Sequence, residues 1–180
     1  MQVGDLHYLL YSPFRYAASA SGTRFGAPHT CGIFYCADDK ETALAETAYW
    51  KTRFAKASAG LQGVGQTVQR TLFEVSIAGP AVDLRLEPFN DDPSIWMHPT
   101  DYRATWQIGR QVRANKTIDM VRYQSVRDTT HRCCTAIFNP KAFTCTKPLQ
   151  QEEWTLFVQG DHATFSRASE THHFKFAEAE

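Results

Sequence analysis

Gly32-Ile-Phe-Tyr-Cys-Ala37 continues through Asp38-Asp-Lys40 into Glu41-Thr-Ala-Leu-Ala-Glu-Thr-Ala-Tyr-Trp-Lys-Thr-Arg-Phe54, and this stretch sets the fold. The first part is a short apolar and aromatic run between a glycine and two aspartates, which is typical of a buried strand. The second part combines strong helix formers with apolar residues at helical spacing, and either aspartate can cap its first turn. We therefore predict a buried strand over residues 32–37 followed by a helix over residues 41–54.

Further elements follow on the carboxyl side of this unit. Runs in which apolar and polar residues alternate, or which are apolar throughout, predict strands. One amphipathic stretch predicts a second helix. The predicted strands cover residues 69–77, 81–84, 120–123, 133–138 and 154–158, and the second helix covers residues 102–114. Small residues at 57–65 indicate a loop rather than a domain boundary. Strands outnumber helices and the two are mixed along the chain, so the predicted class is α+β.

The length and composition fit one compact domain. The chain has 180 residues, of which 43% are hydrophobic, including 12 Phe, 7 Tyr and 4 Trp, so it can bury a sizeable core. We therefore expect a single domain over residues 1–180.

Charge and cysteine content narrow the classes of function. Basic and acidic residues number 19 each and form no basic run, so nucleic acid is not expected as a direct partner. No apolar stretch is long enough for a membrane span, and the first ten residues do not resemble a signal peptide. Five cysteines, an odd number, fit reduced thiols in a cytoplasm, and no pair has the spacing of a zinc site, so no metal is expected.

Four polar side chains stand in apolar or glycine-rich surroundings, and each has an ordinary structural explanation beside a functional one. Arg24 lies in a flexible loop, where it is either a surface arginine or a clamp for a pyrophosphate. Tyr35 lies in the predicted strand, where it packs in the core or offers a ring for stacking. Glu46 is a solvated helix residue or a carboxylate facing a pocket. Ser125 follows a predicted strand, where serine usually bonds to the local backbone, and no nucleophile elbow surrounds it.

The histidines and the paired cysteines give weaker signals. His172 and His173 are close to the carboxyl terminus, where a tail can fray, and we interpret them as structural or incidental. Cys133 and Cys134 are adjacent on a predicted strand and therefore point to opposite faces, so at most one of them can reach a site. Buried, unreactive thiols are the preferred interpretation.

Five motifs in order resemble the RES domain, a family named for its arginine, glutamate and serine. They are Phe14-Arg-Tyr16, Gly22-Thr-Arg-Phe25, Gly32-Ile-Phe-Tyr35, Glu41-Thr-Ala-Leu-Ala-Glu46 and Tyr123-Gln-Ser-Val-Arg-Asp128. The resemblance is strongest over residues 11–140. It implies a fold like that of ADP-ribosyltransferases, in which small central β-sheets are flanked by helices.

The resemblance also implies a function. RES proteins are toxins of bacterial toxin–antitoxin pairs that act on NAD, and their partner is an Xre-like antitoxin. By resemblance Glu46, Arg24, Tyr35 and Ser125 form the active site, with Glu46 stabilising the charge that develops on the ribose. Arg24 would neutralise the pyrophosphate, Tyr35 would stack on the nicotinamide and Ser125 would orient the NAD. Arg15 and Arg127 would add phosphate contacts.

The acceptor of the ADP-ribose stays open at this point. Some family members transfer it to a protein, including an enzyme of nucleotide synthesis, whereas others use water or phosphate and so deplete NAD. The opening motif and the Tyr49-Trp50 pair favour the branch that modifies proteins. An inactive module that only binds its antitoxin is a rival from another class. A ribonuclease is disfavoured, because the chain has no basic, aromatic-rich surface run and no evident histidine pair.

Overall fold

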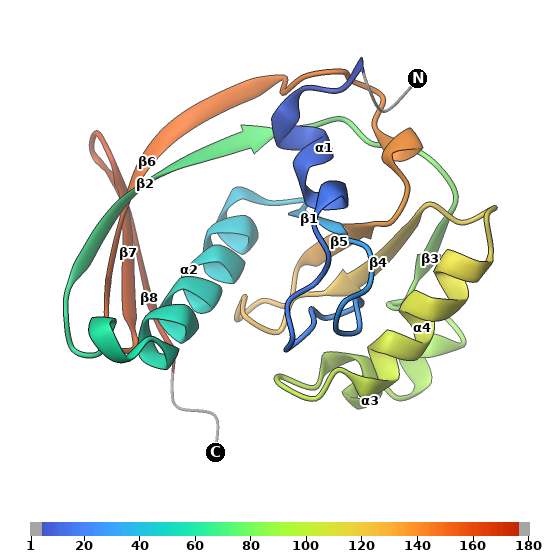
Figure 1. Cartoon of the computed structure of the whole chain (residues 1–180), viewed down its shortest axis with the longest axis horizontal. Coiled ribbons are helices and arrows are strands. Elements are labelled where there is room, and N and C mark those ends of the chain that lie inside the picture. Colours follow the sequence, from blue (N-terminus) through green and yellow to red (C-terminus); the bar gives the residue numbers. More distant parts are fainter. Residues whose placement is uncertain (1–4, 177–180) are drawn as a thin grey trace.

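Two four-stranded β-sheets stand on either side of one long helix, α2 (Figure 1). The computed structural model describes residues 5–176. The helices are α1 (Tyr8–Arg15), α2 (Lys40–Ala57), α3 (Ser94–Met97) and α4 (Arg103–Ala114), with short 3-10 turns η2 (Ala59–Leu61), η3 (Phe89–Asp91) and η4 (Pro140–Ala142). The strands are β1 (Phe34–Ala37), β2 (Gln66–Glu74), β3 (Ala81–Asp83), β4 (Met120–Gln124), β5 (Cys133–Ile137), β6 (Gln150–Gln159), β7 (His162–Arg167) and β8 (Glu170–Lys175).

The first sheet has the strand order β1-β5-β4-β3 and is antiparallel except for the β3–β4 pair. All of β5 is buried, because each face of the sheet is covered by its own apolar cluster. Phe25, Val121 and Ile108 of α4 belong to the cluster on one face, and Phe34, Ile137 and Leu10 of α1 belong to the cluster on the other. Alternate residues of one strand therefore face two different cores.

The second sheet has the order β2-β6-β7-β8 and is antiparallel throughout. Its inward residues include Trp154, Leu156 and Phe165, which share a core with Leu44 and Ala48 of α2. The outward residues of these strands are largely polar and exposed, as expected for a sheet covered on one face only.

Two faces of helix α2 make different contacts. Its buried residues Leu44, Ala48 and Ala55 pack against the second sheet. Residues 43, 46, 47, 50, 54 and 57 recur at helical spacing on the opposite side and line a pocket against the first sheet. The helix therefore presents pocket-lining side chains on one face, while its other face packs against the second sheet.

The predicted α+β class, with small sheets flanked by helices, is confirmed. Both predicted helices form, and so do the predicted strands, with ends shifted by a few residues. The strand predicted over residues 69–77 instead covers Gln66–Glu74. Asp39 occupies the N-cap position of α2, but its side chain makes no capping hydrogen bond. Among the described residues, every helix falls short of the combined length and apolarity that a bilayer crossing demands.

Four helices and strands were not predicted: α1, the one-turn helix α3, β7 and β8. Helix α1 contains Pro13, which argues against a helix from sequence, although it sits within the first two turns of the observed one. Strands β7 and β8 carry mostly polar outward residues and only short apolar alternation. As a result, His172 and His173 do not lie in a frayed tail: they lie inside β8, where His172 Nε2 is 2.9 Å from Glu170 Oε1.

Candidate active site

A pocket of about 710 Å³ opens between α2, the inner face of the first sheet and the loop that carries Arg24. This volume falls within the range of small-molecule and cofactor sites. We call it the α2 pocket, and six of the residues that line it together are Arg24, Tyr35, Glu46, Trp50, Tyr102 and Tyr123. Three of the four residues predicted from the sequence therefore line one cavity, and the fourth, Ser125, touches it through Glu46.

Glu46 and Ser125 form a direct pair. The Ser125 hydroxyl donates a hydrogen bond of 2.6 Å to Glu46 Oε1. Ser125 Oγ in turn accepts hydrogen bonds of 3.1 Å from the backbone N–H groups of Arg127 and Asp128. Ser125 is 0% exposed, so its proton is directed at the carboxylate by a fixed backbone turn. This arrangement holds the Glu46 carboxylate in one orientation at the pocket wall.

A second contact joins α2 to the loop that follows β4, one helical turn before Glu46. The Thr42 hydroxyl of α2 donates a hydrogen bond of 2.7 Å to Asp128 Oδ2, which also accepts from Arg132 Nε at 2.7 Å. Burial acts to raise the pKa of Asp128, but hydrogen bonds from Arg132, Thr42 and Thr130 outweigh it and lower that pKa well below its usual range. Asp128 is thus ionised and fastens the loop over residues 125–132 to α2.

Arg24 is buried and held by backbone and rings rather than by a carboxylate. Its side chain is 6% exposed, and Nη1 donates to the carbonyls of Trp96 and His98 at 3.0 and 3.3 Å. The guanidinium carbon lies 4.8 Å from the Tyr102 ring centroid and 5.9 Å from that of Tyr123. Among residues 5–176 it makes no ion pair, which leaves its charge uncompensated beside the pocket.

Tyr35 anchors the Arg24 loop. Its hydroxyl lies 2.8 Å from Thr23 Oγ1 and accepts a hydrogen bond of 3.1 Å from the Phe25 N–H, so the two residues flanking Arg24 are tied to β1. Burial raises the pKa of Tyr35 to about 12, and the hydroxyl stays protonated. The ring lines the pocket, while the hydroxyl is already committed to the loop.

The two further arginines predicted as phosphate contacts lie outside the pocket lining. Arg15 ends α1, which packs on the opposite face of the first sheet, and its guanidinium contacts Tyr11. Arg127 lies over the Tyr49 ring at 3.5 Å and donates to the Pro99 carbonyl. Arg127 also donates to the hydroxyl of the pocket-lining Tyr102 at 3.4 Å, so it contacts the pocket wall from outside, whereas Arg15 is separated from the pocket by the sheet.

The thiols near the site are unreactive. Cys134 lines the pocket and Cys133 faces the other side of β5, as the strand alternation predicts. Burial raises the pKa of both thiols, so neither forms a thiolate at neutral pH. Within residues 5–176, no three His, Cys, Asp or Glu side chains gather in a way that would hold a metal ion.

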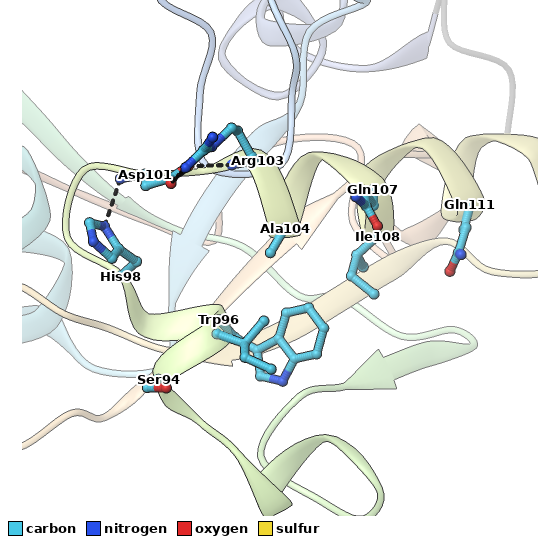
Figure 2. A pocket seen from close by; sticks show the side chains of 10 residues that line it. Ser94, Trp96, His98, Asp101, Arg103, Ala104, Gln107, Ile108 and Gln111 are labelled. Atoms are coloured by element: carbon cyan, nitrogen blue, oxygen red, sulfur yellow. Dashed lines mark hydrogen bonds and ion pairs between the residues drawn. The ribbon is translucent and has the colours of Figure 1, made fainter.

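A second hollow, of about 690 Å³, lies between α3 and α4 (Figure 2). Its wall includes Trp96, Ile108 and the ion pair of Arg103 with Asp101, and His98 Nδ1 accepts from the Asp101 N–H at 2.7 Å. None of the predicted site residues lines it. Its relation to the α2 pocket is indirect, because Trp96 of α3 and His98, which follows α3, supply the carbonyls that hold Arg24.

Several residues in or beside the site were not predicted from the sequence. Thr42 lies four residues before Glu46, and this spacing alone would have placed the two on neighbouring helical turns. Asp128 stands at the end of the fifth family motif, but the sequence assigned it no role. Tyr102 and Tyr123 carry no sequence signal for a pocket, because only the packing of α4 against the first sheet brings them to Arg24.

Comparison with known protein families matches the chain to the RES domain over residues 2–158. This chain belongs to the RES family. The match extends beyond the predicted range of 11–140 at both ends and contains Arg24, Tyr35, Glu46 and Ser125. RES domains are associated with toxins that use NAD, which gives this RES chain an NAD-related enzymatic character. The comparison with curated proteins finds no match.

Proposed function

We propose that this RES chain cleaves NAD at the bond between nicotinamide and ribose and transfers the ADP-ribose to a protein acceptor. The observation that carries the proposal is the Glu46 carboxylate, fixed by Ser125 at the wall of a pocket whose other charged lining residues are cationic. These are Arg24, Lys51 and Arg53, and none of them makes an ion pair within residues 5–176. Such a pocket suits a ligand with a pyrophosphate and one reacting centre that becomes positive.

The chemistry follows from the charge that develops on the sugar. As the C1′–N bond breaks, its electron pair passes to the nicotinamide nitrogen, which leaves as a neutral molecule without needing a proton. The ribose acquires oxocarbenium character, and a fixed carboxylate stabilises it. The acceptor then forms a bond to C1′, and Glu46 is placed to take the proton that the acceptor loses. Ser125 acts by orienting Glu46, which refines its predicted role as a direct NAD contact.

The remaining residues divide between binding and support. Arg24 supplies a buried charge for the pyrophosphate, since within residues 5–176 its guanidinium contacts two carbonyls and two rings but no carboxylate. Tyr35 presents its ring to the pocket for the nicotinamide and uses its hydroxyl to hold the Arg24 loop. Family membership supports the wider setting that we propose, a cytoplasmic toxin neutralised by an Xre-like antitoxin.

The test is to incubate the purified chain with NAD labelled on the adenylate, with and without bacterial lysate. Free nicotinamide and label on protein are followed together. We expect nicotinamide release and label on a discrete protein band. Nicotinamide release without labelled protein would replace the transferase by an NAD glycohydrolase or phosphorylase. The absence of both signals would leave only the binding module.

The Glu46→Gln variant assigns the activity to the pocket. Because the carboxylate acts on the transition state, we expect nicotinamide release to fall roughly 100-fold or more while NAD binding changes little. Glu153→Gln is the matched control, since Glu153 is exposed on β6 and contacts Thr71 away from the pocket. Equal activity of the Glu46 and Glu153 variants would refute the assignment.

A further inference from the structure

The pocket face of α2 continues beyond Glu46 as an exposed aromatic stripe. Trp50 and Phe54 follow at successive helical turns, line the α2 pocket and remain 39% and 59% exposed. Large aromatic side chains usually bury most of their surface, so two of them open to one cavity indicate a surface for a flat ligand group. The catalytic proposal above uses neither residue.

Two cations flank this stripe on opposite sides. At about 100° per residue, Lys51 and Arg53 lie on either side of the line through Trp50 and Phe54. Arg53 lies 5.6 Å from the Trp50 ring centroid and Lys51 lies 5.7 Å from that of Phe54. Burial, followed by the nearby charge of Arg70, lowers the pKa of Lys51. Neither cation has a carboxylate partner in the part of the chain that the structure describes. A bound anion could therefore form an ion pair with each of them.

The spacing along the helix suits a dinucleotide that reacts at one end. Phe54 lies eight residues beyond Glu46, which at a rise of 1.5 Å per residue is about 12 Å. A cationic nicotinamide is attracted to Glu46 and repelled by Lys51 and Arg53, whereas phosphates have the opposite preference. The charges therefore fix the direction in which such a ligand lies.

We propose that Trp50, Lys51, Arg53 and Phe54, here called the α2 rim, form the binding subsite for the adenylate half of the dinucleotide. The purine stacks on the Trp50 and Phe54 rings, and the cations contact the phosphates. This subsite rests on the proposed function and adds to it the residues that distinguish a dinucleotide from a mononucleotide.

Calorimetric titration of the full chain with ADP and, separately, with nicotinamide mononucleotide tests the subsite. We expect Trp50→Ala and Phe54→Ala to weaken ADP binding roughly tenfold each, as for the loss of one base–aromatic stack, and to leave mononucleotide binding within about twofold. Phe157→Ala is the matched control, because Phe157 is 41% exposed on β6 and does not line the pocket. Both rim aromatics are exposed, so the variants are expected to fold.

The outcomes separate this subsite from the reaction. ADP binding that is absent in the wild type, or unchanged by both rim variants, overturns the subsite even if nicotinamide release is intact. Equal weakening of ADP and mononucleotide binding also overturns it, since the rim would then act on the whole pocket. ADP binding that depends on Trp50, in a chain that releases no nicotinamide, supports the subsite and removes the proposed reaction.

Discussion

At the scale of single residues, the site depends on where one proton is directed. The Ser125 hydroxyl has a single proton, and the backbone N–H groups of Arg127 and Asp128 occupy its lone pairs, so the proton goes to Glu46. A carboxylate held in this way needs no rearrangement when the sugar becomes positive. Of the arginine, glutamate and serine of the family name, Arg24 and Glu46 line the α2 pocket, whereas Ser125 contacts Glu46.

Replacing Ser125 by alanine tests this arrangement. A hydrogen bond to a charged group contributes about 1.5–3 kcal/mol, so we expect kcat for nicotinamide release to fall roughly 10- to 100-fold while KM for NAD changes little. Ser21→Ala is the control, because Ser21 also lines the pocket, but among the described residues its hydroxyl hydrogen-bonds to that of Ser19 and not to Glu46. A rise in KM at unchanged kcat would indicate that Ser125 contacts NAD instead.

The ionised state of Asp128 makes the fold sensitive to acid. Its folded pKa is lowered, so its stabilising effect is fully present above the unfolded pKa of about 3.9 and is lost as the pH falls through the folded value. We expect the stability difference between wild type and Asp128→Asn to be largest at neutral pH and to shrink below about pH 4. Urea unfolding at several pH values measures it. A difference that stays constant from pH 7 to pH 3 would contradict this expectation.

At the scale of elements, α2 and the 125–132 loop are joined by two contacts one helical turn apart. Glu46 meets Ser125, and Thr42 meets Asp128. The second contact lies outside the pocket lining but fixes the register of the first. We therefore expect Thr42 and Asp128 to act as positioning residues for Glu46.

Thr42→Val removes this contact with little change of shape. We expect kcat to fall roughly fivefold, equivalent to about 1 kcal/mol of lost positioning, with KM for NAD unchanged. Thr42→Ser keeps the hydroxyl and should restore kcat. Both variants are assayed well below their melting temperatures, so a purely structural role would leave kcat at the wild-type value.

Helix α4 holds the Arg24 loop from the other side. Trp106 Nε1 donates to the Thr23 carbonyl at 2.8 Å and the Thr105 hydroxyl donates to the Arg24 carbonyl. The contact is close enough to need a glycine, because a Cβ on Gly109 would lie 2.0 Å from the Phe25 oxygen. The helix and the loop therefore meet backbone to backbone.

Gly109→Ala should be destabilising although alanine is the better helix former. The helix propensity favours alanine by about 1 kcal/mol, but the clash is with backbone and cannot be relieved by a rotamer change. We expect a net loss of about 1–3 kcal/mol in urea unfolding. Gly60→Ala is the control, since a Cβ there meets nothing within 4 Å. Similar stabilities of the two variants would show that α4 can shift freely.

At the scale of the whole molecule, the two sheets are linked by shared elements. Helix α2 packs its buried face on the second sheet and presents its other face to the first. Strand β2 runs between the two cores, with Val68 and Leu72 in one and Phe73 in the other (Figure 1). We therefore expect the second sheet and the catalytic pocket to unfold together.

Trp154→Ala tests this coupling from a site in the second sheet. Trp154 is 0% exposed, and its truncation should cost about 3–5 kcal/mol and lower the melting temperature by on the order of 10 °C. Loss of secondary structure and loss of nicotinamide release should share one midpoint. Phe157→Ala, on the outer face of the same strand, should change the midpoint little. Two separate transitions would show that the sheets fold independently.

Much of the fold was predictable from local sequence patterns. The elements that were not predicted were missed for physical reasons. The run from Gly32 to Phe54 carries its own strand and helix signals, so it was predicted almost to its ends. Strands β7 and β8 have only a few inward apolar residues, and their stability comes from pairing with β6 and packing on α2. Helix α1 similarly depends on the cluster that covers Leu10 rather than on its own propensity.

The candidate site, too, was predictable from the sequence only in part. The sequence by itself determined the family and singled out Arg24, Tyr35, Glu46 and Ser125 as candidate site residues, because these lie in short ordered motifs. Only the tertiary structure decided their partners: that Ser125 serves Glu46, that Arg15 lies behind the sheet, and that the rim of α2 is open. The reason is that such contacts join segments as many as 79 residues apart, and the packing of α2 between two sheets, not any local pattern, brings them together.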